Sequence, residues 1–174
     1  MGGNFGFIHE KIEIKMLILF ILRRLPTPVS LDVLTGLAMC DDGISYFDYV
    51  ECVADLVKTE HIRFEDDLYS LTLKGIHNGG ITENNLPFSV RQEVETNVAI
   101  VRNSMGRNAM IKALHTANTD GSTTVELSLS DGVGDIVSIS LYAANEKQAV
   151  ALENGFRKNA EGIYNTLIEK ILNQ

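Results

Sequence analysis

The residue types that most often perform chemistry are few in this chain and lie far apart. Cys40 and Cys52 are candidates for a redox switch, but their spacing matches no zinc motif. Free cysteines are commonly buried as small apolar side chains, so a structural role is the more frequent alternative. The stretch "HEKIE" at His9 begins like a zinc-protease helix, yet no second His follows at the required distance. These residues predict no metal site.

The remaining motifs also lack a catalytic arrangement. His61, His77 and His115 are scattered and unpaired in the sequence. The glycines of "GVG" at 132–134 lie in a predicted hairpin turn rather than before a helix, which argues against dinucleotide binding. Paired carboxylates, a nucleophile with its base and a phosphate-binding loop are not recognisable. We therefore expect no enzyme activity, no catalytic residues, no cofactor and no metal.

One uncharged surface is a candidate for binding. Serines alternate with apolar residues along two predicted neighbouring strands, so their side chains should share one face of a sheet. Simple exposure to water is the common alternative, because antiparallel sheets often leave one face wet. The candidate effector-binding or subunit face consists of Ser128, Ser130, Ser138 and Ser140.

Composition limits the classes of protein that fit. The chain has 174 residues, enough for one domain or two small ones with a real core. Its formal net charge of −8 argues against strong non-specific attraction to nucleic acid, which needs clustered Lys and Arg. The apolar run 16–22 is too short to span a bilayer and ends in Arg23 and Arg24 without a cleavage site. With only two cysteines, a cytoplasmic protein with no membrane contact is expected.

The first half of the chain is predicted to hold three helices and a hairpin. The first helix covers 9–25, the second starts after Ser30 as N-cap, and the third runs from Tyr46 to about Thr59. Ser45 and Asp48 stand in capping-box register at the start of the third helix. Strand-like segments then flank the acidic turn 65–67. The turn-rich stretch 78–87 predicts a boundary between domains 1–80 and 87–174.

The second half is predicted to be a helix, three strands and a long helix. Ser89 would cap the first helix, and Gly106 would end or kink it. Alternating apolar residues predict strands at 108–117, 122–130 and 135–143, joined by good turn sequences. Asn145 would cap the final helix, which reaches about Leu172. That helix exceeds what a small sheet can cover, so part of it is a candidate dimer contact.

Residues 29–75, "VSLDVLTGLAMCDDGISYFDYVECVADLVKTEHIRFEDDLYSLTLKG", resemble the winged helix-turn-helix domain of PadR- and MarR-type bacterial transcriptional regulators. The matching features are the apolar face of the third helix, Ile62 entering the hairpin, and Tyr-x-Leu-Thr-x-x-Gly from Tyr69 to Gly75. The whole chain is also similar in length and element order to an uncharacterised bacterial winged-helix-like family. The resemblance implies an α+β fold: a winged helix-turn-helix, then a helix–three-stranded antiparallel meander–helix domain for dimerisation or effector binding. It further implies a dimeric regulator that binds double-stranded DNA.

The chain departs from that family at the residues that would contact DNA. Glu60-His61 replaces the usual Gly-Leu before the hairpin, and the third helix and hairpin tip are acidic. The alternative function is therefore a winged-helix module that binds a protein partner without direct DNA contact. Charge reversal at Asp48, Glu51 and Asp55 should leave the fold intact if these side chains lie outside the core. The residues expected to contact DNA or a partner are Ser45, Tyr46, Phe47, Asp48, Glu51, Cys52, Asp55, Arg63 and Lys74.

Overall fold

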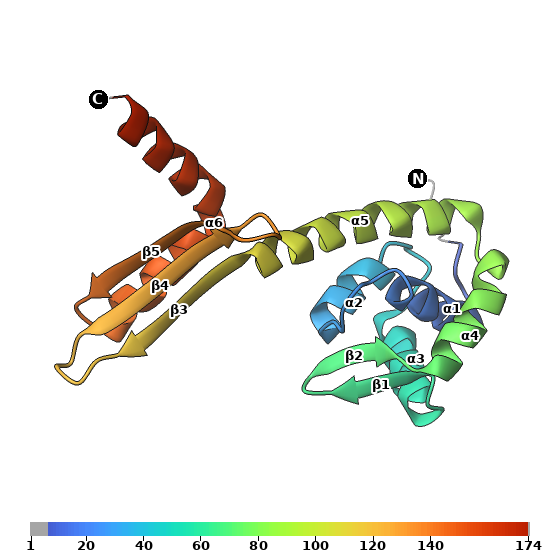
Figure 1. The fold of residues 1–174 in the computed structure, drawn as a ribbon. Coiled ribbons are helices and arrows are strands. Elements are labelled where there is room, and N and C mark those ends of the chain that lie inside the picture. The colour runs from blue at the N-terminus through green and yellow to red at the C-terminus, as the bar shows by residue number, and fades with distance from the viewer. Residues whose placement is uncertain (1–6, 174) are drawn as a thin grey trace, which may run out of the picture. The chain divides into compact units, whose positions relative to one another are not determined.

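The computed structural model describes residues 7–173 and confirms the predicted α+β fold (Figure 1). The first six residues of the predicted N-terminal domain and Gln174 lie outside the described residues. The chain forms two compact units that divide between Arg102 and Asn103. This division falls inside a long helix, downstream of the stretch 78–87 where composition predicts a boundary.

The first unit is built around helix α1 (Lys11–Leu22), which packs against α2 (Leu31–Ala38) and α3 (Tyr46–Lys58). Every residue from Leu17 to Leu22 is buried, because neighbouring elements cover α1 on several sides. Ser30 caps α2 as predicted, its hydroxyl accepting a hydrogen bond from the Val33 amide. All three predicted helices of this unit are therefore present, and α1 forms the core of the unit.

A two-stranded hairpin follows α3, as predicted. Strands β1 (Ile62–Glu65) and β2 (Leu68–Leu71) pair antiparallel, with Ile62 opposite Leu71 and Glu65 opposite Leu68. The two residues of the turn, Asp66 and Asp67, have φ of 52° and 60°. Two consecutive residues with positive φ make a type I′ turn, whose twist suits a tight hairpin although Asn and Gly fit it better than Asp.

Helix α4 (Leu73–Thr82) and the 3₁₀ turn η1 (Glu83–Asn85) occupy most of the stretch predicted to be a turn-rich break, so that prediction was wrong. Thr72 caps α4 by accepting a hydrogen bond from the Gly75 amide. A Cβ at Gly75 would lie 2.0 Å from the carbonyl oxygen of His61. The glycine therefore permits close packing of the helix, which outweighs its poor helix propensity.

Helix α5 (Phe88–Met110) continues through Gly106, which corrects the predicted end or kink there. Ser89 lies inside the helix rather than at its cap. Nothing lies within 4 Å of the position that a Cβ at Gly106 would take, so no packing contact favours a break. An isolated glycine destabilises a helix by only about 1 kcal/mol relative to alanine, and α5 remains helical in spite of this cost.

The second unit is an antiparallel three-stranded sheet covered on one face by α6 (Figure 1). Strands β3 (Ile111–Ala117), β4 (Thr123–Ser130) and β5 (Asp135–Ala143) lie in the order β3-β4-β5. Helix α6 (Glu146–Leu172) starts at the predicted cap Asn145, whose side chain accepts a hydrogen bond from the Gln148 amide. The core of the unit forms between α6 and the alternating apolar residues of the strands.

Candidate functional site

The candidate site of the first unit is the surface formed by α3, the hairpin and the start of α4. The junction between α3 and β1 places Glu60 at φ 58°. The amides of Glu60 and His61 donate to the carbonyls of Val57 and Leu56, which makes a Schellman cap. A cap of this kind favours glycine at its left-handed position. The Gly-to-Glu departure from the resembling family thus falls on a residue under conformational strain.

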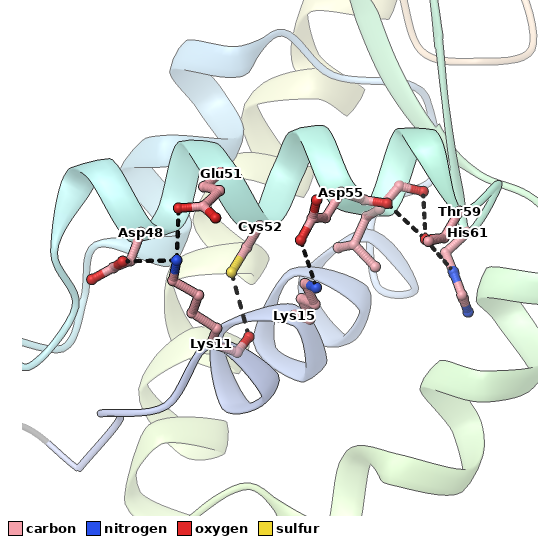
Figure 2. Close-up of polar contacts among 9 residues, drawn as sticks. Lys11, Lys15, Asp48, Glu51, Cys52, Asp55, Thr59 and His61 are labelled. Carbon is pink, nitrogen blue, oxygen red and sulfur yellow. Dashed lines mark hydrogen bonds and ion pairs between the residues drawn. The ribbon is translucent and has the colours of Figure 1, made fainter.

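The acidic side chains of α3 point toward α1 and are paired there (Figure 2). Lys11 Nζ lies 2.6 Å from Glu51 Oε2 and 3.5 Å from Asp48 Oδ1. Lys15 Nζ lies 2.9 Å from Asp55 Oδ2. Each carboxylate thus has an ammonium partner on α1.

This pairing changes the electrostatics of the helix surface. The hydrogen bond to Glu51 raises the pKa of Lys11, and the hydrogen bond from Lys15 lowers the pKa of Asp55. Asp48 does not complete the predicted capping box, because the Ser45 side chain makes no cap hydrogen bond. The Asp48 carboxylate lies instead beside Lys11. The three acids thus form one flank of α3 rather than its outermost face.

Cys52 was predicted to be exposed on this surface, but it is fully buried. Its Sγ donates a hydrogen bond to the Lys11 carbonyl at 3.4 Å, and burial raises the pKa of the thiol. Burial also raises the pKa of Cys40 to about 11. A protonated thiol is a poor nucleophile, so both environments support the structural role rather than the redox switch.

The outward face of α3 is largely uncharged. Phe47 is 83% exposed, and Tyr46, Val50 and Ala54 are also exposed. The charge among the exposed residues of α3 comes from Glu51, which is paired with Lys11, and from Lys58 at the end of the helix. Sequence periodicity assigns Val50 to the buried side, together with Tyr49, Val53, Leu56 and Val57. The structure corrects this for Val50, because α1 covers the neighbouring flank of the helix instead.

An open groove of ≈ 730 Å³ lies between the end of α3, the hairpin and the start of α4. Its apolar part is mostly exposed, including Phe64, Leu73 and Ile76. The two predicted contact residues Arg63 and Lys74 also line it. Lys74 Nζ donates to the Thr59 carbonyl at 2.7 Å, and Arg63 Nε lies 3.6 Å from Glu65. The cations of the groove are thus partly engaged within the chain.

The structure brings three of the four predicted serines together on an open pocket of ≈ 380 Å³ in the second unit. Ser128 is paired directly with Ser138 across β4 and β5, and Ser140 is paired with Glu126. Ser130, the last residue of β4, does not line this pocket. Its hydroxyl bonds to the adjoining hairpin turn, donating to the Gly134 carbonyl and accepting from the Gly132 amide. Lys112, Glu126 and Asp135 also line the pocket, so this face is not the uncharged surface that the sequence predicts.

The described part of the chain holds neither a cluster of metal-ligand residues nor a membrane-spanning helix. Within residues 7–173, no three His, Cys, Asp or Glu side chains gather as metal ligands would. None of the helices in this range combines the length and the apolar character needed to cross a bilayer.

Comparison with known proteins shows the family of the chain. The model of the family DUF4364, described as a domain of unknown function, matches residues 14–171. Because this match covers most of the chain, the chain belongs to that family. No curated protein and no solved structure matches it. The resemblance to PadR- and MarR-type regulators stays a prediction.

Proposed function

We propose that this member of the DUF4364 family is a winged-helix transcriptional regulator that acts as a homodimer in the bacterial cytoplasm. The order of α1, α2, α3 and the β1–β2 hairpin supports this reading, because it is the order of a winged helix-turn-helix. In such a domain α3 meets the major groove and the hairpin follows the backbone. The second unit then serves dimerisation or effector binding.

The observation that carries the proposal is the pairing of the α3 acids with Lys11 and Lys15. Free carboxylates facing DNA would repel phosphates, whereas paired carboxylates on a flank repel them less. The outward face then meets the groove with Tyr46, Phe47 and Val50. Apolar side chains of this kind can contact the methyl group of thymine.

The proposal also implies weak, salt-tolerant binding. The exposed cations near the end of α3 and on the hairpin and α4 are Lys58, Arg63 and Lys74. Each phosphate contact contributes about −0.9 to the slope of the logarithm of the binding constant against the logarithm of salt concentration. We therefore expect a slope no steeper than about −3 when one domain contacts the duplex, and no steeper than about −5 when both domains of a dimer do. Strong DNA binders make about 6–10 phosphate contacts, so even the dimer lies at the lower end of that range.

The second candidate is a protein-interaction module without DNA contact. Two observations favour it: the exposed aromatic side chain of Phe47 and the apolar groove lined by Phe64, Leu73 and Ile76. The acidic hairpin tip, with Asp66 and Asp67 exposed, would also suit a basic partner. Exposed apolar surface beside a groove is a frequent mark of protein interfaces.

Retention of random duplex DNA by the full chain, titrated with salt, separates the two. A regulator should bind at about 50 mM salt and weaken with the shallow slope given above. Lys58→Glu with Arg63→Glu should reduce binding by at least about tenfold, since two phosphate contacts are lost. Lys147→Glu, an exposed position at the start of α6, is the matched control and should leave binding unchanged. No retention even at about 50 mM salt would reject the regulator and favour the interaction module.

A further inference from the structure

Helix α6 bends sharply at Asn159, which has φ −141° and ψ 34°. The side chain of Asn159 lies against Gly162, where an added Cβ would be 2.3 Å from Asn159 Oδ1. The bend changes the direction of α6, and Ala160, Ile163 and Tyr164 just after it still pack against the sheet.

Arg107, near the end of α5, forms hydrogen bonds to α6 around this bend. Its guanidinium donates to the carbonyls of Arg157 at 3.0 Å and Lys158 at 3.4 Å. The same group pairs with both oxygens of Glu161, each at 2.7 Å. The Arg107 side chain therefore bonds to residues before the bend and to Glu161 after it. These bonds stabilise the bent conformation of α6.

Ile163 and Tyr164 still pack against the core of the sheet, but the last turns of α6 have no cover within the described part of the second unit. These turns, residues 165–172, run away from the three strands, as the red end of the ribbon in Figure 1 shows. Leu167 and Ile168 are partly exposed, and Ile171 and Leu172 are 65% and 75% exposed. Residues four apart lie in one column of a helix, so these side chains form two adjacent apolar columns.

The sheet carries a second apolar strip that is only partly covered, along β5. Helix α6 packs chiefly on β3 and β4, and Arg157 donates a hydrogen bond to the Ala113 carbonyl of β3. The inward residues of β4 are buried, whereas Val137 and Ile139 of β5 are only partly buried and Leu141 is 37% exposed. The strand at this edge is therefore less completely covered by α6 than its neighbours.

We propose that residues 165–172 of α6 dock over β5 of a second copy of this chain, and that the helix of the second copy docks in return. One chain carries both surfaces, an uncovered apolar helix end and a strip that its own helix covers only in part. A two-fold exchange covers both at once and closes the assembly. This inference rests on the homodimer of the proposed function, but it is independent of DNA binding.

Charge and symmetry are consistent with a second copy as the occupant. The segment 165–172 carries only Glu169 and Lys170 as charged residues, so its formal charges cancel and a like copy is not repelled. Eight helical residues span about 12 Å. A two-fold exchange places two such helix ends and two β5 strips in one interface, which doubles the area that a single docking would bury.

The mass of the full chain in solution, measured by light scattering and sedimentation, tests the proposal. The wild type should be a dimer. Ile168→Glu with Ile171→Glu should raise the dimer Kd by about 100-fold or more, since two buried anchors become charged. Unchanged circular dichroism and thermal unfolding would show that the fold is kept. Ile81→Glu with Ile100→Glu adds the same charges at exposed apolar positions of the first unit and should leave the dimer intact.

A crosslink locates the contact. With Cys40 and Cys52 replaced by Ala, chains carrying Leu141→Cys and chains carrying Ile171→Cys are mixed and oxidised. Docking over β5 predicts a disulfide between the two kinds of chain, in preference to Ile171→Cys pairing with itself. A monomeric wild type, a dimer that survives Ile168→Glu with Ile171→Glu, or absence of the mixed crosslink would each overturn the proposal. If the wild type passes these dimer tests but does not retain DNA, the proposed function is rejected and the dimer proposal stands.

Discussion

Nε2 of His61 lies 2.8 Å from Nδ2 of Asn78, so the imidazole joins the start of the hairpin to helix α4. Nδ1 of the same ring lies 2.9 Å from Thr59 Oγ1, and that hydroxyl donates to the Asp55 carbonyl. The ring therefore donates from Nδ1 to the Thr59 oxygen and accepts the Asn78 amide at Nε2. Only the neutral imidazole can make both bonds.

The first unit should lose stability as the pH falls below neutrality. Burial, together with Lys74 and Lys15, lowers the pKa of His61 below its ordinary value of 6.5. The unfolded chain then binds the proton more readily than the folded chain, so the free energy of unfolding falls as pH drops through 6.5 toward the folded pKa. Urea unfolding at pH 7.5 and at pH 5 measures this loss. His61→Gln should reduce it, whereas exposed His77→Gln should not. Equal pH dependence in wild type and His61→Gln would contradict the assignment.

Glu60→Gly should stabilise the protein by about 0.5–1 kcal/mol, because φ of 58° suits glycine and strains glutamate. Chemical denaturation would show the gain as a higher midpoint. Lys58→Gly, two residues earlier inside α3, is the matched control and should destabilise by about 1 kcal/mol. If both substitutions destabilise alike, the left-handed cap does not govern this junction.

Reversal of Asp48, Glu51 and Asp55 to Lys should leave the helices in place but lower the melting temperature by a few degrees. This modifies the expectation from sequence, because the new lysines would face Lys11 and Lys15 across the α1–α3 contact. Thermal unfolding followed by circular dichroism measures the change. Adding Lys11→Glu and Lys15→Glu should recover most of the loss. Failure of this recovery would show that the pairs contribute nothing to stability.

Gly75→Ala should destabilise strongly, by about 2 kcal/mol or more, since its Cβ would meet the His61 carbonyl at 2.0 Å. Gly106→Ala is the control, because nothing lies near that position in α5 and helix propensity alone should stabilise it by up to about 1 kcal/mol. Denaturant unfolding of both variants decides the matter. Similar effects at the two positions would mean that α4 does not pack as closely as the structure has it.

The elements that the sequence predicts well are those specified by neighbouring residues. Alternation along β4 and β5 and the caps Ser30 and Asn145 depend on neighbours a few positions away, and the structure has them as expected. Helix α4 was missed because its glycines look like turn residues in isolation. What makes them helical is the close approach of Gly75 to His61 and of Gly79 to Arg23.

The candidate site divides in the same way. Residue types alone establish that α3 is acidic, that its inner face is apolar and that the hairpin tip carries three acids in a row. They also establish an α+β chain with a long final helix, because periodicity is a local property. Which way the acids point depends on lysines about 40 positions earlier in the chain, and the bend in α6 depends on Arg107, 54 positions before Glu161. Contacts between such distant residues form only when packing brings the elements together. Local sequence patterns therefore do not predict them.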